Sequence, residues 1–353
     1  MKPQRTLILV CLIEAVLLAS PVVVQAQFTF TTNCGSITIT GYTGTNGNVV
    51  IPEMTNGYRI IAIGDYAFVD NPFVTNVNIS ACITNVGNYV FANCIRLNTI
   101  DVSVSNLFYA TMNGVLFNRN KVQLIQYPAG KGENSYTIPN SVVIIGNAAF
   151  YAATSLTNVT IPNGVKSIGL EAFYACNLIC VKIPDGNMEI GSWAFWYCTS
   201  LTTITIPSSV SSIGGFAFAN CVNLRGIYFD GDAPRYMDSL DFADDAQAIA
   251  YYLPGTTGWE DFAANTGLGT AFWMLPNPSI LNSEPNFGIQ NVGFGFTISW
   301  ATNVAVAVDA CTDLSNPLWQ PVQTNTLTSG TSYFSDPQWT NYPTRFYRVR
   351  SAP

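Results

Sequence analysis

The segment I-P-S-S-V-S-S-I-G-G-F-A-F-A-N-C-V-N-L-R-G-I-Y-F, residues 206–229, decides the fold of this chain. It follows the template I-P-x-x-V-x-x-I-G-x-x-A-F-x-x-C-x-x-L-x-x-I-x-I, in which the last Ile of one copy begins the next. Two columns of the template recur, a glycine column at Gly64, Gly87, Gly146, Gly169, Gly191 and Gly214, and a phenylalanine column at Phe68, Phe91, Phe150, Phe173, Phe195 and Phe218. The steps are 22 or 23 residues, except one of 59 residues that holds an altered unit between Val102 and Ile138. The period predicts a solenoid of stacked coils.

The chemistry of one unit explains why the coils must stack. In residues 201–206 the Leu and Ile side chains point inward and the Thr side chains outward, and Pro207 ends the strand because it has no N–H group. Val210 and Ile213 then return to the core, and a short helical turn that carries Phe218 fills it. About seven buried apolar side chains contribute roughly 10–20 kcal/mol. Ordering the backbone of ~23 residues costs ~1–2 kcal/mol each, so neighbouring coils must supply the missing contacts.

The chain begins with the features of a secretory signal peptide. Lys2 and Arg5 precede an apolar run over residues 7–18, and an A-x-A-like cleavage site ends at Ala26. An uncleaved anchor is the alternative, but this run is short for a membrane span, and no second apolar stretch of ~20 residues follows. Residues 1–26 are therefore predicted to be removed, leaving a mature chain without a membrane span that is secreted or held at the cell surface.

The period of the sequence changes along the rest of the chain. Residues 27–49 alternate apolar residues with Thr around a turn and predict a hairpin that caps the first coil. Residues 50–230 hold the repeats. Residues 231–275 depart from the template and predict a C-terminal cap that covers the core with aromatic side chains, namely Trp259, Phe262, Phe272 and Trp273.

Two further segments follow the cap. Residues 276–290 lack apolar periodicity and predict a linker. Residues 291–353 alternate with period two and predict a small β-sandwich-like module. The predicted fold class is therefore mainly β with short helical turns, a solenoid followed by a small β domain.

Histidine is absent from all 353 residues, which excludes serine and cysteine hydrolases that use histidine as base, and histidine zinc sites. The net charge of −7 without basic clusters excludes a nucleic-acid footprint. Carboxylates alone remain for an enzyme, and nothing fixes a pair of them across a cleft. The chain is predicted to be non-enzymatic and without a cofactor; turnover of a polysaccharide that is lost on changing Asp241 or Asp244 to Asn would favour the alternative.

The repeated unit resembles the BspA-like leucine-rich repeats of bacteria, in which Ile-Pro closes the strand and Ile-Gly-x-x-Ala-Phe-x-x-Cys forms the return. The resemblance covers roughly residues 45–230, and the altered unit, with Gly114-Val115-Leu116-Phe117, resembles a variant of it. It implies a secreted or surface protein, because several members of this family are associated with adhesion to host proteins or to other cells. Residues 291–353 resemble a β-module appended to large secreted proteins of environmental bacteria.

Cysteine occupies one template column at Cys94, Cys176, Cys198 and Cys221. Stacked coils give these residues parallel Cβ vectors, which is poor geometry for a disulfide, so they are predicted to be buried free thiols. Cys180 falls on an outward strand position beside Lys182 and is predicted to be the most reactive thiol. Pairing of Cys180 with a neighbour remains an alternative.

The outward strand positions form the largest regular surface that the sequence predicts. A curved sheet of hydroxyl and amide groups suits a protein or glycan partner in adhesion or surface assembly. The predicted partner-binding residues on this concave strand face are Thr157, Asn158, Thr160, Lys182, Thr202, Thr203, Thr205, Arg225 and Tyr228. The alternative is a structural spacer or matrix component, since Thr and Asn are also ordinary solvated strand and turn residues.

An acidic cluster follows the last repeat, at Asp230, Asp232, Asp238, Asp241, Asp244 and Asp245. Its spacing is not that of an EF-hand loop. Asp is favoured near a helix N-terminus without any metal. A solvated, helix-starting loop without a metal is therefore predicted.

Overall fold

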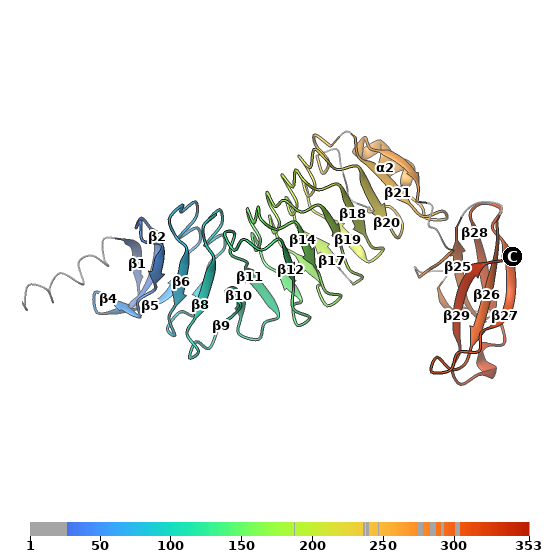
Figure 1. Ribbon diagram of the computed structural model, residues 1–353, viewed down its shortest axis with the longest axis horizontal. Coiled ribbons are helices and arrows are strands. Elements are labelled where there is room, and N and C mark those ends of the chain that lie inside the picture. Colours follow the sequence, from blue (N-terminus) through green and yellow to red (C-terminus); the bar gives the residue numbers. More distant parts are fainter. Residues whose placement is uncertain are drawn as a thin grey trace, which may run out of the picture.

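The computed structural model describes residues 27–186, 188–235, 237, 240–245, 247–273, 278–282, 287–290, 293–300 and 304–352 (Figure 1). The signal peptide predicted over residues 1–26 lies outside these ranges. Short parallel strands succeed one another along one axis from the N-terminal hairpin to residue 272, and antiparallel strands follow. The chain is a mainly β solenoid followed by a smaller group of sheets.

Each regular coil contributes one strand to a front sheet, whose outward side we call the front face. These strands pair in parallel as three groups: β3 (Asn48–Val50), β6 (Asn76–Ile79) and β8 (Thr99–Val102); β12 (Ser135–Thr137) and β14 (Asn158–Thr160); and β16 (Cys180–Lys182), β18 (Thr203–Ile206), β20 (Gly226–Phe229), β21 (Ile249–Tyr252) and β22 (Gly269–Phe272). Strands β14 and β16 are also in contact. Side chains alternate along each strand, so Val159, Val181, Ile204 and Ile227 are buried while their neighbours face outward.

Most coils add a second strand that the repeat template did not predict. These strands also pair in parallel, as β5 (Tyr58–Ile63) with β7 (Asn85–Val86), and as β11 (Gln123–Gln126), β13 (Ile144–Ile145), β15 (Ser167–Ile168), β17 (Met188–Ile190) and β19 (Val210–Ile213). They carry the V-x-x-I part of the template. The second sheet explains why that Ile is constant: it is buried, as at Ile145 and Ile168, while the adjacent backbone pairs with the next coil.

The return turn after each template glycine is built from left-handed residues instead of a continuous helical turn. The second and sixth residues after the glycine have positive φ, as Trp193 (55°) and Tyr197 (61°) do after Gly191. This geometry lets alternate N–H groups point to the next coil: the N–H groups of Trp193, Phe195 and Tyr197 donate to main-chain carbonyls of that coil at 3.0, 2.8 and 3.1 Å. The turns therefore form a third inter-coil ladder of hydrogen bonds.

Glycine at a left-handed position should stabilise the chain. Ala175 has a φ of 53°, a conformation that costs a residue with a Cβ ~1–2 kcal/mol, whereas the extra backbone entropy of Gly costs ~0.5–1 kcal/mol. We expect Ala175→Gly to raise the free energy of unfolding by about 0.5 kcal/mol, measured by urea denaturation. Ala172→Gly in the same turn, buried and without positive φ, is the control and should lose about 1 kcal/mol. Equal losses in both variants would contradict the strain.

The interior of the solenoid is a column of stacked aromatic rings. Phe150, Phe173, Phe195, Phe218 and Phe242 lie parallel, with ring centroids 4.8–5.6 Å apart. Beside them the template cysteines are buried free thiols, as predicted, and each donates to the carbonyl of a Phe in the preceding coil, as Cys176 does to Phe150 O at 3.0 Å. Burial raises the pKa of Cys176 to about 12, so this thiol is protonated and unreactive at neutral pH.

The first coil is covered by the hairpin that the alternation predicts. Strands β1 (Phe28–Asn33) and β2 (Ser36–Tyr42) are antiparallel, β2 pairs in parallel with β5, and β4 (Met54–Thr55) pairs antiparallel with β5. Phe28 and Tyr42 lie against Phe68, with ring centroids 6.3 and 5.2 Å away. The hairpin thus covers the open end of the aromatic column.

The altered unit divides the core in two. Strand β10 (Val115–Asn118) pairs antiparallel with β9 (Tyr109–Met112) on one side and with β11 on the other. Leu116 packs into the core that contains Phe68 and Phe91, whereas Val115 and Phe117 pack into the core of the later coils. Because side chains of a strand alternate between its faces, this one strand separates the two cores.

The segment predicted as C-terminal cap extends the front sheet before it closes it. Strands β21 and β22 continue the parallel pairing beyond β20, and α2 (Trp259–Thr266) buries Trp259 and Phe262 against the core. Phe272 differs from the prediction: it is 53% exposed, because β22 is the terminal strand of its sheet. Trp273 lies on the front face and not over the core, against Tyr228.

The last part of the chain forms two antiparallel sheets. One contains β23 (Ser279–Leu281), β24 (Gly288–Gln290), β25 (Gly293–Ser299) and β28 (Thr331–Asp336); the other contains β26 (Ala305–Cys311), β27 (Gln320–Thr326) and β29 (Phe346–Ser351), with the 3-10 turn Trp339–Asn341 before β29. Buried residues of both sheets share one core, including Phe296 and Val308. The sandwich class stays a prediction, but residues 276–290 are not a plain linker, because β23 and β24 in this segment pair with β25.

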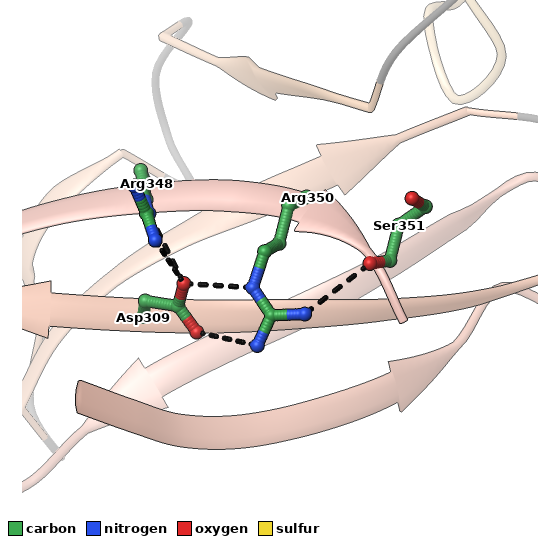
Figure 2. A network of polar contacts seen from close by, with 4 residues as sticks. All are labelled: Asp309, Arg348, Arg350 and Ser351. Carbon is green, nitrogen blue, oxygen red and sulfur yellow. Dashed lines mark hydrogen bonds and ion pairs between the residues drawn. The ribbon is translucent and has the colours of Figure 1, made fainter. Parts of the chain in front are cut away.

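A buried carboxylate ties two strands of the second sheet together. Figure 2 shows Asp309, 2% exposed, accepting from Arg350 Nε (2.8 Å) and Nη2 (3.1 Å) and from Arg348 Nε (3.0 Å). Arg348 also stacks over the Trp319 ring, 4.7 Å from its centroid. Hydrogen bonds from Arg350, opposed by burial and aided by Arg348, hold the pKa of Asp309 below its usual value. The ion pair therefore persists in mild acid.

Candidate functional site

Register on the front face brings outward side chains of successive coils into continuous rows. Lys182 lies opposite Thr205, Thr205 opposite Tyr228, and Tyr228 opposite Tyr251. A parallel row contains Cys180, Thr203 and Gly226. Strand β14 precedes them and exposes Asn158 and Thr160 on the same face. Neighbouring strands of a sheet are ~4.8 Å apart, so one extended ligand could touch several coils.

An aromatic patch closes the C-terminal end of the front face. The rings of Tyr228 and Tyr251 are stacked, 5.0 Å apart at 12°, and Trp273 lies 5.0 Å from Tyr228 at 55°. Gly226 allows the Tyr228 ring to lie back along the sheet, since a Cβ at this position would be 2.8 Å from Tyr228 Cε2. All three rings of this patch are partly exposed. The patch offers amphipathic contact area with little conformational freedom to lose.

Charges of both signs lie at the edge of the same rows. Lys182 is exposed, and Asp185 and Asp230 are close enough to influence one another. Burial, reinforced by the charge of Asp185 and opposed by Lys182, raises the pKa of Asp230 above its usual value. The front face thus combines hydroxyl groups, an aromatic patch and both a cation and carboxylates within a few strands.

A shallow hollow of about 310 Å³ lies on this face between β14 and β16. It is lined by side chains of both strands and of the turns after them, including Asn158, Thr160, Cys180 and Lys182. Hydroxyl, amide, thiol and ammonium groups therefore converge there. A hollow of this size is at the small end of ligand pockets, and it suits one side chain or one sugar unit of a larger partner.

Three of the predicted partner-binding residues have bonds of their own. The hydroxyls of Thr157 and Thr202 donate to Asn134 O and Ile179 O of the preceding coils, both at 2.9 Å. Arg225 folds back, and its Nη1 donates to Val222 O and Leu224 O at 3.2 and 3.1 Å. Thr157 and Thr202 therefore support coil stacking. The other six residues, Asn158, Thr160, Lys182, Thr203, Thr205 and Tyr228, lie together on the front face.

Sequence reasoning missed Tyr251 and Trp273, which were assigned to a cap. The signal that could have found them is the alternation in Ile249–Tyr252, which matches the outward and inward positions of the repeat strands. Because residues 231–248 do not fit the template, the spacing gave no register for this strand. The aromatic end of the face became evident only from the pairing of β20 with β21.

The acidic cluster continues the coil-to-coil bonding. Asp241 accepts the N–H of Phe216 with Oδ1 at 3.0 Å and that of Phe218 with its main-chain carbonyl at 3.1 Å. Burial, aided by the charge of Asp244, raises the pKa of Asp245 to about 8, so this carboxyl is largely neutral at pH 7. Within the described ranges, which omit Asp238, no three His, Cys, Asp or Glu side chains are grouped to hold a metal ion. These carboxylates hold the last turns together.

The described part of the chain contains no helix long and apolar enough to cross a membrane. The exposed cysteines are Cys34 on the N-terminal hairpin and Cys180 on the front face, and both are free. Cys180 is therefore an accessible thiol next to Lys182, as predicted from its strand position.

Comparison with known proteins places the repeats. A model of the BspA type leucine-rich repeat region matches residues 25–134 and 129–236, in six copies. A search of curated protein sequences gave no match. Among solved structures, a leucine-rich repeat protein from Eubacterium ventriosum is 22% identical, covering 64% of this chain and 82% of that protein, with a TM-score of 0.47.

Two further solved structures are similar. The pneumococcal vaccine antigen PcpA is 15% identical, with 70% of this chain and 97% of that one covered and a TM-score of 0.42. A leucine-rich cell surface protein from Faecalibacterium prausnitzii is 20% identical, with 70% and 93% covered and a TM-score of 0.33. The family model matches more than half of the chain in the register of the observed coils. The chain therefore belongs to the BspA type leucine-rich repeat family.

Proposed function

We propose that this protein binds a protein or glycan partner through its front face, in adhesion or surface assembly. The observation that carries the proposal is the continuous row Lys182, Thr205, Tyr228 and Tyr251, which ends in the aromatic patch. Rigid aromatic rings next to hydroxyl groups are typical of the centres of binding surfaces. The hollow between β14 and β16 adds a recess on the same face.

The proposed setting is outside the cell. The sequence of residues 1–26 has the pattern of a secretory signal, and one similar structure is named as a cell surface protein. The family is one of repeat proteins, and the absence of histidine from the chain removes the commonest acid-base residue, which favours a binding role over catalysis.

Changes at the aromatic patch should weaken partner binding. A ligand retained from an array of glycans and matrix proteins is titrated against the wild type and against Tyr228→Ala. Loss of a stacked ring at the centre of the face should cost about 2 kcal/mol, roughly 30-fold in Kd. Lys182→Glu should add to the loss by reversing the cation of the row.

Tyr197→Ala is the matched control, because Tyr197 is 50% exposed but lies on a return turn. It should leave the Kd within about twofold. Unchanged affinity of Tyr228→Ala and Lys182→Glu for every retained ligand would discard the front face as the site. A loss of affinity in Tyr197→Ala alone would instead place the site on the return turns.

A further inference from the structure

A pocket of about 240 Å³ lies where the altered unit interrupts the regular coils. Its walls are the return turn Gly87–Phe91 on one side and Gly146 with Asn147 on the other, and Ile125 and Gln126 lie between them. It is separate from the front face, since none of its residues belongs to the rows of that face. The pocket follows from a shortened turn, which also leaves hydrogen-bond donors without partners.

Strand register shows how much shorter this turn is. Leu124 pairs with Ile145, and Tyr136 with Val159. The first members of these pairs are 12 residues apart and the second members 14, so the altered coil lacks two residues. Tyr127 nevertheless fills the phenylalanine column, because its ring stacks on Phe150 at 5.2 Å. The missing residues therefore come from the start of the return turn, between Ile125 and Tyr127.

The shortening removes the acceptors of the inter-coil ladder. In the regular coil before it, the N–H groups of Tyr66 and Phe68 donate to Asn88 O and Val90 O at 3.0 and 2.9 Å. The corresponding N–H groups of Tyr89 and Phe91 line the pocket and have no acceptor among the described residues. Phe91 is 1% exposed, and a buried N–H without a partner costs free energy comparable to a lost hydrogen bond.

The other side chains around the pocket are uncharged, and several are amides. Asn118 Oδ1 already accepts the N–H groups of Val122 and Gln123, which leaves its NH₂ group to donate. Asn147 reaches across to Asn88, Nδ2 to Oδ1, at 3.4 Å. A charged ligand would find no counter-ion among these lining residues, whereas an uncharged ligand rich in acceptors would find donors.

We propose that this pocket binds a short, uncharged segment of a partner polypeptide whose main-chain carbonyls accept from the N–H groups of Tyr89 and Phe91. These two donors are two residues apart, and in other coils the same pair is satisfied by carbonyls two residues apart. The volume equals roughly eight waters at ~30 Å³ each, which admits a short peptide segment. The bound segment completes the ladder as an added strand completes a sheet edge.

The bound segment should have small side chains where it lies over Ile125 and Gln126. The next coil carries Asn147, Ala148 and Ala149 at the positions that the altered turn lacks. The test uses N-acetyl-Asn-Ala-Ala-amide as the peptide probe and methyl glucoside as an uncharged sugar, with amide hydrogen exchange of the full chain as the readout.

Without a probe, the amides of Tyr89 and Phe91 should exchange roughly 100-fold faster than those of Phe68 and Phe173, which are bonded to the next coil. The tripeptide at about 10 mM, ten times a millimolar Kd, should slow both amides by about tenfold and leave Phe173 unchanged. Asn88→Trp fills the pocket and should abolish the slowing. Gly215→Trp, in the same template column but with open space around its Cβ, should keep it.

Failure of the tripeptide to slow Tyr89 and Phe91 in the wild type would overturn the proposal. So would slowing by methyl glucoside alone, which would mean a sugar site. These outcomes do not depend on the folding of either variant. They are also independent of the front face, because a partner lost on Tyr228→Ala does not test the exchange of Tyr89.

Discussion

Replacing Gly214 by Ala is expected to destabilise the solenoid by about 3 kcal/mol, the upper part of the range for overpacking. A Cβ at this position would lie 2.8 Å from Gly191 C and against Ser192 N, both backbone atoms of the preceding coil. Backbone atoms cannot rotate away as a side chain can, so the coils must separate or shift. Denaturation by guanidinium, followed by tryptophan fluorescence, measures the loss.

Gly215→Ala is the matched control, one residue further along the same turn. No atom lies within 4 Å of a Cβ built on Gly215, and its φ is not positive. The free energy of unfolding should therefore change by less than about 0.5 kcal/mol. Similar losses in the two variants would show that the spacing of the coils does not require the template glycine.

Replacing both arginines around Asp309 should have the second large effect. Arg348→Gln with Arg350→Gln leaves a carboxylate that is 2% exposed without its cations. Breaking a buried ion pair from one side costs about 3–5 kcal/mol. Hydrogen exchange of the β26 amides in the full chain reports this local stability separately from that of the solenoid.

Adding Asp309→Asn to the two arginine changes is the control, because it removes the uncompensated charge and should recover most of the loss. The pH dependence has a definite sign. The folded pKa of Asp309 lies below its ordinary value of about 3.9, so its contribution is complete above that pH and is lost as the pH falls through the folded pKa. Equal protection of β26 in the wild type and the double variant at pH 7 would contradict the role of the ion pair.

The sequence was sufficient for the repeat because its signal is spacing. Template residues such as Phe195 and Cys198 are fully buried, and their period follows from identical coils in contact. The outward positions in β18 and β20 followed from alternation within a strand. The four template cysteines were also predicted correctly, because one column cannot be both stacked and cross-linked.

Other features depend on contacts between segments that no local pattern encodes. The left-handed residues of the return turns, among them Trp193 and Ala175, arise from bonding to the next coil and not from residue preference. Arg225 was expected to face a partner, but its guanidinium meets two carbonyls of its own turn. The aromatic patch with Tyr251 required the register of a strand outside the template.

The most direct test of the proposed binding face uses the exposed thiol within it. In a Cys82→Ser background, one sample carries a polyethylene glycol maleimide on Cys180 with Cys34→Ser, and the other carries it on Cys34 with Cys180→Ser. Both are applied to the array of glycans and matrix proteins. We predict at least one ligand that the Cys34-labelled chain retains and the Cys180-labelled chain loses. Retention of the same ligands by both chains, or retention of none by either, would contradict the assignment of partner binding to the front face.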